Sequence, residues 1–109
     1  PYASLAMLRA EGKTQAAAQH FLAEASELVQ ALADSLQQGD GGITVYPAVP
    51  SPVAKVANVE RAQLLIESPS RPLLQRFLQA AHPTWLALGK ANRPHGLLRW
   101  AVDVDPLAI

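Results

Sequence analysis

The stretch Asn58-Val-Glu-Arg-Ala-Gln-Leu-Leu-Ile-Glu-Ser-Pro-Ser-Arg-Pro72 joins a strand pattern directly to the start of a helix. Positions 62, 64 and 66 are apolar, whereas Arg61, Gln63 and Glu67 lie between or beside them. This alternation predicts a strand over 58–67 with one buried face and one face open to solvent or a partner. Ser68-Pro-Ser-Arg-Pro72 then predicts a helix start, because serine before proline is a typical N-cap.

The preceding sequence predicts a strand, a long helix and a short second strand. Residues 2–10 are largely apolar on both faces, which is typical of a central strand. Thr14 is a suitable N-cap for a helix over 14–38, and the glycine-rich residues 39–42 end it. Residues 43–46 are β-prone. Three prolines within 47–52 then predict an irregular or polyproline-like loop.

The sequence after Pro72 predicts a second helix and a last strand. Pro83 removes one helical hydrogen bond, so we expect a kink or a break there. Residues 89–96 are expected to form a loop, and residues 97–104 a strand. The apolar positions of this helix form one stripe: Leu74, Phe77, Leu78, Ala81, Trp85 and Leu88.

The order β-α-β-β-α-β predicts an α+β domain over residues 1–109 with the ferredoxin-like, split βαβ arrangement. Right-handed crossovers would place both helices on one face of a four-stranded sheet. The expected core comprises Leu28, Leu32, Leu64, Phe77, Leu78 and Trp100. The other, open sheet face is expected to carry Arg9, Arg61, Gln63, Arg99 and Asp103.

Composition excludes several classes of protein. The 109 residues are 50% hydrophobic, which argues against disorder, and the absence of cysteine excludes disulfides and thiolate metal sites. No apolar run is long enough for a membrane span, and no signal peptide is evident, so we expect a cytoplasmic protein. The chain begins with Pro-Tyr instead of Met, which fits a piece of a longer protein or a processed one.

The formal charge sums to zero, but the two halves differ. Residues 1–54 hold 2 basic and 5 acidic side chains, a net charge of −3; residues 55–109 hold 7 basic and 4 acidic ones, a net charge of +3. A neutral total argues against a dedicated nucleic-acid scaffold, yet this asymmetry leaves room for one modest basic face.

Catalytic signatures are missing. The glycine-rich residues 39–42 lack the lysine of a phosphate-binding loop, and no serine lies in a nucleophile elbow. The three histidines, His20, His82 and His95, are scattered and are expected to be solvated, so a zinc site is not predicted. We therefore expect no catalysis by this chain and no cofactor of its own.

Arginines on the open sheet face are candidate binding residues. Arg9, Arg61 and Arg99 would contact nucleic acid or another domain; alternatively, they are solvated and pair across strands with Glu67 or Asp103. Sequence alone favours neither reading. Trp85 and Trp100 lie on apolar stripes and are expected in the core instead of on a base-stacking platform.

Several short motifs occur in a characteristic order along the chain: Leu8–Gly12, Val49-Pro-Ser-Pro52, Arg61-Ala-Gln-Leu-Leu65, Ser68-Pro-Ser-Arg71 and Arg99-Trp-Ala-Val-Asp-Val-Asp-Pro106. In this order they resemble the C-terminal domain of the PriA (primosomal protein N′) family of replication-restart DNA helicases. The resemblance spans nearly the whole chain.

The resemblance implies an interaction domain that supports binding of branched or single-stranded DNA and of the C-terminal tail of the single-stranded-DNA-binding protein, SSB. It implies further that ATP and zinc bind in other domains of the parent helicase, and that this domain packs on the helicase core. Arg71 and Gln75 match the tail-binding residues of the family. DNA contacts, expected to be weak and sequence-independent, are assigned to Arg61, Lys90, Arg93 and Arg99.

Two alternatives remain open from the sequence. The domain is purely structural and packs on the helicase lobes, or it is an unrelated ferredoxin-like regulator that binds a small ligand.

Overall fold

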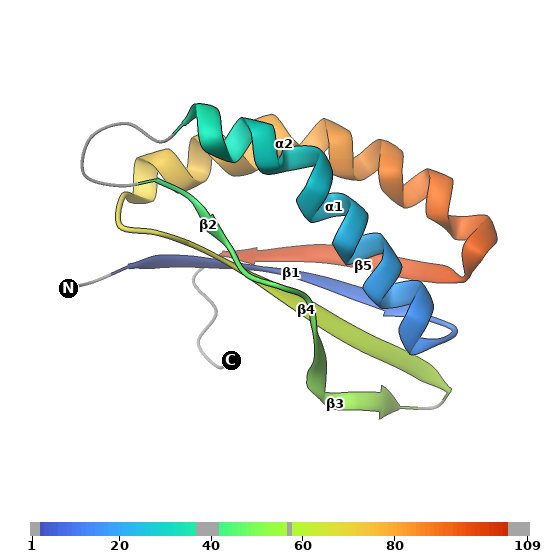
Figure 1. Ribbon diagram of the computed structural model, residues 1–109. Coiled ribbons are helices and arrows are strands. Elements are labelled where there is room, and N and C mark those ends of the chain that lie inside the picture. Colours follow the sequence, from blue (N-terminus) through green and yellow to red (C-terminus); the bar gives the residue numbers. More distant parts are fainter. Residues whose placement is uncertain (1–2, 37–41, 57, 105–109) are drawn as a thin grey trace.

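The structure is a computed structural model that describes residues 3–36, 42–56 and 58–104, with the backbone alone for 52–56. Two long helices lie side by side on one face of an antiparallel sheet (Figure 1). Along the chain the elements are β1 (Ser4–Gly12), α1 (Gln15–Ser35), β2 (Thr44–Val45), β3 (Val49–Val56), β4 (Val59–Ser68), α2 (Arg71–Asn92), the short 3-10 helix η1 (Arg93–His95) and β5 (Leu97–Val104).

The five strands of the described residues form one sheet in which β1 is central; four strands were expected, and the additional strand is the proline-containing β3. The order is β2-β4-β1-β5, and β3 pairs with β4 beside β2. All pairings are antiparallel, and β1 contacts β4 on one side and β5 on the other. The two-sided apolar pattern of the first strand therefore indicated its central place correctly.

The proline-rich segment is a strand and not the loop that we expected. Val49 and Pro50 pair with β4, and pairing resumes at Lys55 and Val56 after a register shift. Proline lacks an N–H donor, so sheets accept it on edge strands and at bulges. β3 is an edge strand with such an irregularity, which explains why the prolines do not disrupt it.

Thr14 was predicted correctly as the first N-cap, whereas the N-cap of the second helix is Ser70 and not Ser68, the serine before proline that the sequence indicated. The Thr14 side chain accepts a hydrogen bond from the Ala17 N–H, and Ser70 accepts one from the Leu73 N–H. These bonds satisfy backbone donors that the first helical turn leaves unpaired. The end of the second helix was predicted wrongly, because α2 continues through Pro83 and past Gly89 to Asn92.

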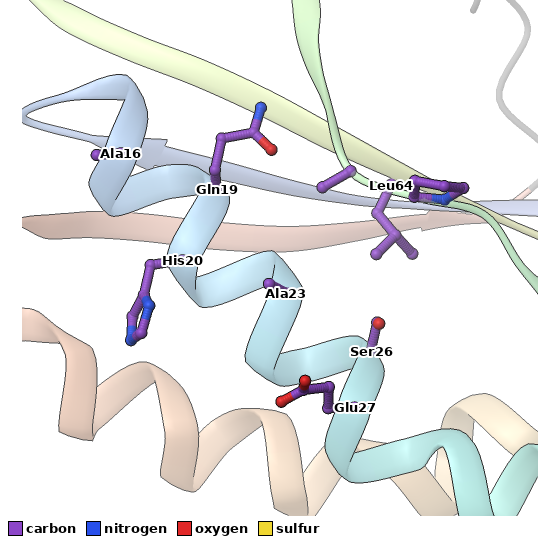
Figure 2. Close-up of a pocket in the computed structure, with 9 residues that line it drawn as sticks. Ala16, Gln19, His20, Ala23, Ser26, Glu27 and Leu64 are labelled. Atoms are coloured by element: carbon purple, nitrogen blue, oxygen red, sulfur yellow. The ribbon is translucent and has the colours of Figure 1, made fainter.

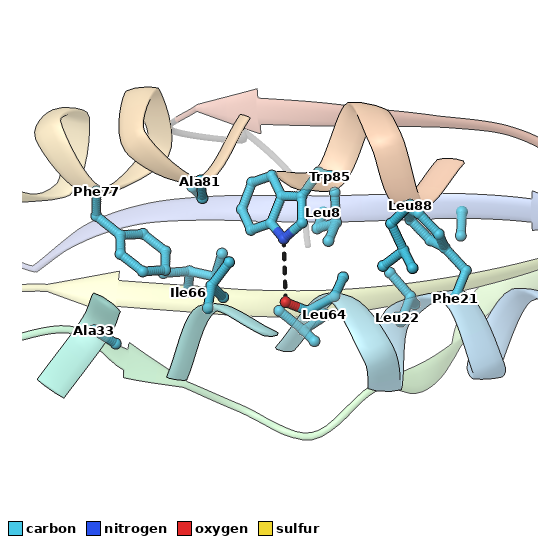
Figure 3. Close-up of a cluster of buried hydrophobic side chains, with 14 of the residues drawn as sticks. Leu8, Phe21, Leu22, Ala33, Leu64, Ile66, Phe77, Ala81, Trp85 and Leu88 are labelled. Atoms are coloured by element: carbon cyan, nitrogen blue, oxygen red, sulfur yellow. Dashed lines mark hydrogen bonds between the residues drawn. The ribbon is translucent and has the colours of Figure 1, made fainter. Parts of the chain in front are cut away.

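The core lies between the helices and one sheet face (Figure 3). Leu64 and Phe77 are fully buried, as predicted, and Leu32 and Leu78 are partly buried against them. Leu28 was assigned wrongly, since 57% of its surface is exposed. The buried stripe of α1 runs instead through Ala18, Phe21, Leu22, Ala25, Val29 and Ala33, so Leu28 falls to its side.

Trp85 joins the two helices inside this core. It is 1% exposed, and its indole N–H donates to the carbonyl of Ala25 in α1 over 3.2 Å (dashed line in Figure 3). Its ring meets Phe77 edge-on, with centroids 6.2 Å apart. A buried indole needs a hydrogen-bond acceptor, and the helix backbone supplies one.

Trp100 packs on the core, as predicted, from β5. Its ring lies 5.9 Å from that of Phe21 and is partly buried. Leu98 does not share this environment, because the register shifts between Glu11 and Gly12: Arg99 pairs with Glu11, and Leu97 with Gly12. Leu97 is therefore buried, whereas Leu98 lies at the irregularity and is 39% exposed.

Some expectations fall outside the described residues: the glycine-rich turn up to position 41, the start of the first strand at Tyr2, and the last two residues, Asp105 and Pro106, of the motif that begins at Arg99. Across the parts that the structure describes, no helix has the length and apolar character needed to cross a membrane.

Candidate nucleic-acid and peptide-binding surfaces

Glu11 lies between two of the candidate DNA-binding arginines on the open sheet face. β1 extends to Gly12, which places Glu11 directly opposite Arg61 of β4 and Arg99 of β5. Arg99 Nε donates to Glu11 Oε1 over 2.9 Å. Arg61 Nε lies 3.5 Å from Glu11 Oε2 without a hydrogen bond to it. The three side chains form a basic–acidic–basic row across the sheet.

The third arginine of this face is also paired. Arg9 Nε contacts Asp103 Oδ2 at 2.5 Å, which confirms one of the two cross-strand pairings considered for it. The carboxylate of Glu67, the other partner considered, instead accepts a hydrogen bond from the Tyr46 hydroxyl over 2.8 Å. Carboxylates thus offset much of the positive charge that the sequence assigned to this face.

Arg99 stays accessible despite its pairing. Its side chain is 76% exposed, against 40% for Arg61. Exposed ion pairs contribute little energy and exchange partners readily. Of the two sheet arginines, Arg99 is therefore the better placed to contact an external anion.

Lys90 and Arg93 lie at the end of α2 that leads through η1 into β5. Both are exposed, and Lys90 occupies the last helical turn, where a cation is favoured by the helix dipole. The start of β5, with Arg99, follows within a few residues. Figure 1 shows that the start of α1 and the start of β4 lie at the same end of the molecule. We call Lys90, Arg93 and Arg99 the basic end.

Arg71 and Gln75 lie at the opposite end of α2, in its first two turns. Both side chains are exposed, and their spacing of four residues places them on one helix face. The backbone offers fewer anion donors here than a helix start usually does. Pro72 has no N–H, and the Leu73 N–H is bonded to Ser70 Oγ. Recognition of an anion would therefore rest on the two side chains.

A shallow groove of about 510 Å³ runs between α1 and the segment that links β2 to β3 (Figure 2). Its walls include His20 and Glu27 from the helix and Leu64 from β4. His20 Nε2 lies 2.9 Å from Glu24 Oε1 on the next turn. The groove combines small apolar side chains with the polar side chains of His20, Ser26 and Glu27.

His95 lines a second shallow hollow together with His20 at the start of α1, whereas His82 lies beside Trp100. His82 is exposed on α2 with its ring 5.7 Å from that of Trp100, and His95 is exposed in η1. Within residues 3–36, 42–56 and 58–104, no group of three or more histidine, aspartate or glutamate side chains is arranged to hold a metal ion.

Tyr46 supplies a pH-dependent prediction. Its hydrogen bond to Glu67, together with the repulsion that an ionised tyrosine would feel from that carboxylate, raises the pKa of Tyr46 above its ordinary value. The contribution of this hydrogen bond to folding stability is present below the ordinary pKa of tyrosine. It is lost as the pH rises through the raised pKa of Tyr46 in the folded protein. The substitution Glu67→Gln removes the negative charge beside Tyr46 and should therefore lower its pKa, which an alkaline absorbance titration measures. The variant Tyr46→Phe shows which part of the titration signal belongs to Tyr46. An unchanged titration would contradict the contact.

The sequence comparison decides the family. The primosomal protein N C-terminal domain family matches residues 1–107. The chain belongs to this PriA C-terminal domain family. The resemblance found in its motifs is thereby confirmed, and membership connects the chain with DNA replication, replication restart and the primosome.

Solved structures share the fold at low sequence identity. A hydantoinase/carbamoylase family amidase from Burkholderia ambifaria is 11% identical with a TM-score of 0.65; the alignment covers 94% of this chain and 27% of that one. An amidase of the same family from Burkholderia multivorans is 15% identical with a TM-score of 0.62, covering 94% and 26%. The de novo designed protein Foldit4 is 10% identical with a TM-score of 0.60, covering 96% and 98%. The chain spans about a quarter of the length of these amidases, and identities this low show the fold alone.

Sequence reasoning missed Glu11 as the partner of Arg61 and Arg99. The first strand was expected over residues 2–10, so Glu11 fell outside it, whereas the strand continues to Gly12. The alternation itself carried the signal, because Met7, Arg9 and Glu11 share one strand face.

Proposed function

We propose that this chain is the non-catalytic C-terminal interaction domain of a PriA-like replication-restart helicase. In this role it supports binding of branched or single-stranded DNA and of the SSB C-terminal tail during primosome assembly. The observation that carries the proposal is the pair Arg71 and Gln75, both exposed on one face of the opening turns of α2 in a chain of this family.

The tail of SSB is acidic and ends in a hydrophobic residue with a free carboxylate, as the family resemblance implies. Arginine binds a carboxylate with two parallel N–H donors, and Gln75 can add an amide hydrogen bond one turn along. Because Pro72 and the bonded Leu73 N–H leave the backbone little part in this site, the Arg71 side chain carries most of the expected affinity. Helicase lobes of the parent protein are proposed to complete the pocket.

Replacing Arg71 by alanine in a full-length homologue should weaken binding of the tail peptide by about tenfold or more, since a charged hydrogen bond contributes roughly 1.5–3 kcal/mol. Isothermal titration calorimetry measures this. Arg76→Ala is a matched control, because Arg76 is also exposed on α2 but one position away from Gln75 on another side of the helix. Equal affinity for the Arg71 variant and the parent would remove Arg71 from the site.

DNA binding is assigned to the basic end, with Arg61 as a further contributor. Few phosphates can be neutralised by a chain of zero net charge, so binding should be weak, sequence-independent and sensitive to salt. The pairing of Arg61 and Arg99 with Glu11 gives Lys90 and Arg93 the larger part.

The double variant Lys90→Ala/Arg93→Ala should flatten the salt dependence of binding to single-stranded DNA. Each lost phosphate contact lowers the slope of log affinity against log salt by about 0.7. Fluorescence anisotropy at several salt concentrations measures the slope, with Arg76→Ala as a control for a loss of charge elsewhere on α2. Tight binding that persists in high salt, or a slope that the double variant leaves unchanged, contradicts the assignment.

A structural role is the second candidate. On the open sheet face, Met7 is 1% exposed, Gln63 is 9% exposed, and the arginines are offset by carboxylates. A nearly neutral face of this kind suits packing on another domain of the same chain, the proposed helicase core. Loss of helicase-core contacts on Arg9→Glu substitution, measured by hydrogen exchange in a full-length homologue, would favour this role; unaltered exchange would oppose it.

The remaining parts of the proposal concern the parent protein. We propose that ATP and zinc bind in its other domains, and that it acts in the cytoplasm. We also assign the fold to the ferredoxin-like, split βαβ class, since β1 lies between β4 and β5 and both helices cover one face.

A further inference from the structure

β5 is the terminal strand of the sheet at the edge opposite β2 and β3. One side of β5 pairs with β1 from Val104 to Leu97. A strand at the end of a sheet presents backbone N–H and C=O groups along its outer side, which makes it a template for another strand. Large apolar side chains are exposed at both ends of β5: Leu98 at 39% and Val104 at 44%.

The sequence of β5 is complementary to itself about Ala101. Residues at equal distance from Ala101 are oppositely charged, as Arg99 and Asp103 are, or both apolar, as are Trp100 with Val102 and Leu98 with Val104. In an antiparallel pair with a two-fold axis at Ala101, each residue faces its counterpart from the other copy. Such an isologous contact requires a surface that is complementary to itself, and this strand has one.

We propose that two copies of this chain associate through antiparallel pairing of their β5 strands, centred on Ala101, so that one sheet continues across both copies. The occupant of the β5 edge is a second copy of the same chain. The inference shares Arg99 with the DNA-binding surface proposed above, but its argument rests on the order of residues in β5 and does not require DNA or SSB binding.

The charged pairs fall on the open sheet face. Arg99 and Asp103 share that face with Glu11 and Arg9, their partners within the chain. Both retain access to a partner copy, because the Arg99 side chain is 76% exposed and that of Asp103 47%. A guanidinium has five N–H donors, so Arg99 can bind Glu11 through Nε and a second carboxylate through its terminal nitrogens.

The apolar pairs fall on the helix-covered face and at the strand ends. Trp100 and Val102 are partly buried against the core, and pairing would remove more of their surface from water. His82 and Gly89 of α2 lie beside Trp100. Leu86 lies one helical turn from both of them and is 45% exposed, so it adds apolar surface along the same edge. One strand pair with a helix flank is a small interface, so the association belongs to the weak, concentration-dependent class.

Charge exchange tests the register. The variants Arg99→Asp and Asp103→Arg each place like charges opposite one another in a homodimer, and both should be monomeric in sedimentation equilibrium at concentrations where the parent chain associates. An equimolar mixture of the two variants restores opposite charges at every pair and should associate again. The proposal is overturned if the unsubstituted chain remains monomeric at millimolar concentration. It is also overturned if the mixture of the two variants remains monomeric although both variants are folded.

A cysteine placed on the two-fold axis tests the same contact without altering charge. The chain has no cysteine, and Ala101 is exposed. Directly opposite residues of antiparallel strands have Cβ atoms about 4.5–5.5 Å apart, close enough for a disulfide after a small adjustment. Ala101→Cys should form covalent dimers roughly tenfold faster or more than the control Ala31→Cys on the exposed side of α1, because pairing raises the local thiol concentration. Equal rates, or cross-links to a different protein in their place, overturn the self-pairing.

Discussion

Replacing Trp85 by alanine should remove a large part of the stability of this domain. The side chain is 1% exposed, meets Phe77 edge-on, and is hydrogen-bonded to the backbone of the other helix. Truncation of a buried tryptophan costs about 3–5 kcal/mol. A domain of this size has a total free energy of unfolding of about 5–15 kcal/mol, so this loss is a large fraction of it and the variant should unfold at a markedly lower urea concentration. Urea denaturation followed by circular dichroism measures the loss.

The substitution Trp85→Phe distinguishes the contribution of the hydrogen bond to stability from that of side-chain packing. Phenylalanine keeps an aromatic ring but has no donor for the Ala25 carbonyl. That carbonyl keeps its place in the α1 ladder, so the loss of the bond should cost about 1 kcal/mol, with a further cost for the smaller ring. Equal stability of the alanine and phenylalanine variants would show that packing at this position contributes little.

Replacing Gly89 by alanine should destabilise the domain, although alanine normally stabilises a helix interior by about 1 kcal/mol relative to glycine. A Cβ atom at this position would lie within 2.9 Å of Trp100 Cδ1 and closer still to its Nε1. Trp100 is rigid and packed against Phe21, so it must move as a unit. Overpacking of this kind costs roughly 1–3 kcal/mol, which exceeds the gain in helix propensity.

A second substitution identifies the cause. If the clash with Trp100 is responsible, Gly89→Ala in a Trp100→Leu background should be neutral or stabilising, because the helix propensity then acts alone. Chemical denaturation of the four proteins of this cycle gives the coupling energy. A Gly89→Ala variant more stable than the parent would show that the indole moves aside without cost.

Strands and helices with clear periodicity could be predicted from the sequence. The last strand was predicted with its observed bounds, Leu97–Val104, and the N-cap Thr14 was recognised from residue type; the second helix start was placed in the right segment, two residues before its N-cap Ser70. These features depend on neighbours within a few residues, and such interactions are visible in the order of side chains. Leu28 shows the limit of this approach. Which side of a broad apolar stripe is buried depends on the direction from which the sheet approaches.

The residues of the candidate DNA-binding site were chosen from the sequence by residue type, but strand pairing decides which charges lie next to one another. Arg61 and Arg99 were placed on the open face, where they lie, but their charges are shared with Glu11. A carboxylate in β1 and arginines in β4 and β5 become neighbours only when the central strand joins the other two. The charge available to a nucleic acid is therefore a property of the assembled sheet.

The sequence by itself determined the family, the order of most elements and the residue types at both ends of α2, because motifs and periodicity are local. Tertiary structure decided the rest. The prolines of β3 are accepted because that strand lies at a sheet edge, and the missing side chain of Gly89 in α2 leaves room for Trp100. Each of these outcomes depends on a contact between segments far apart in the chain. Local propensity gives no information about such contacts until the sheet and the helices have packed together.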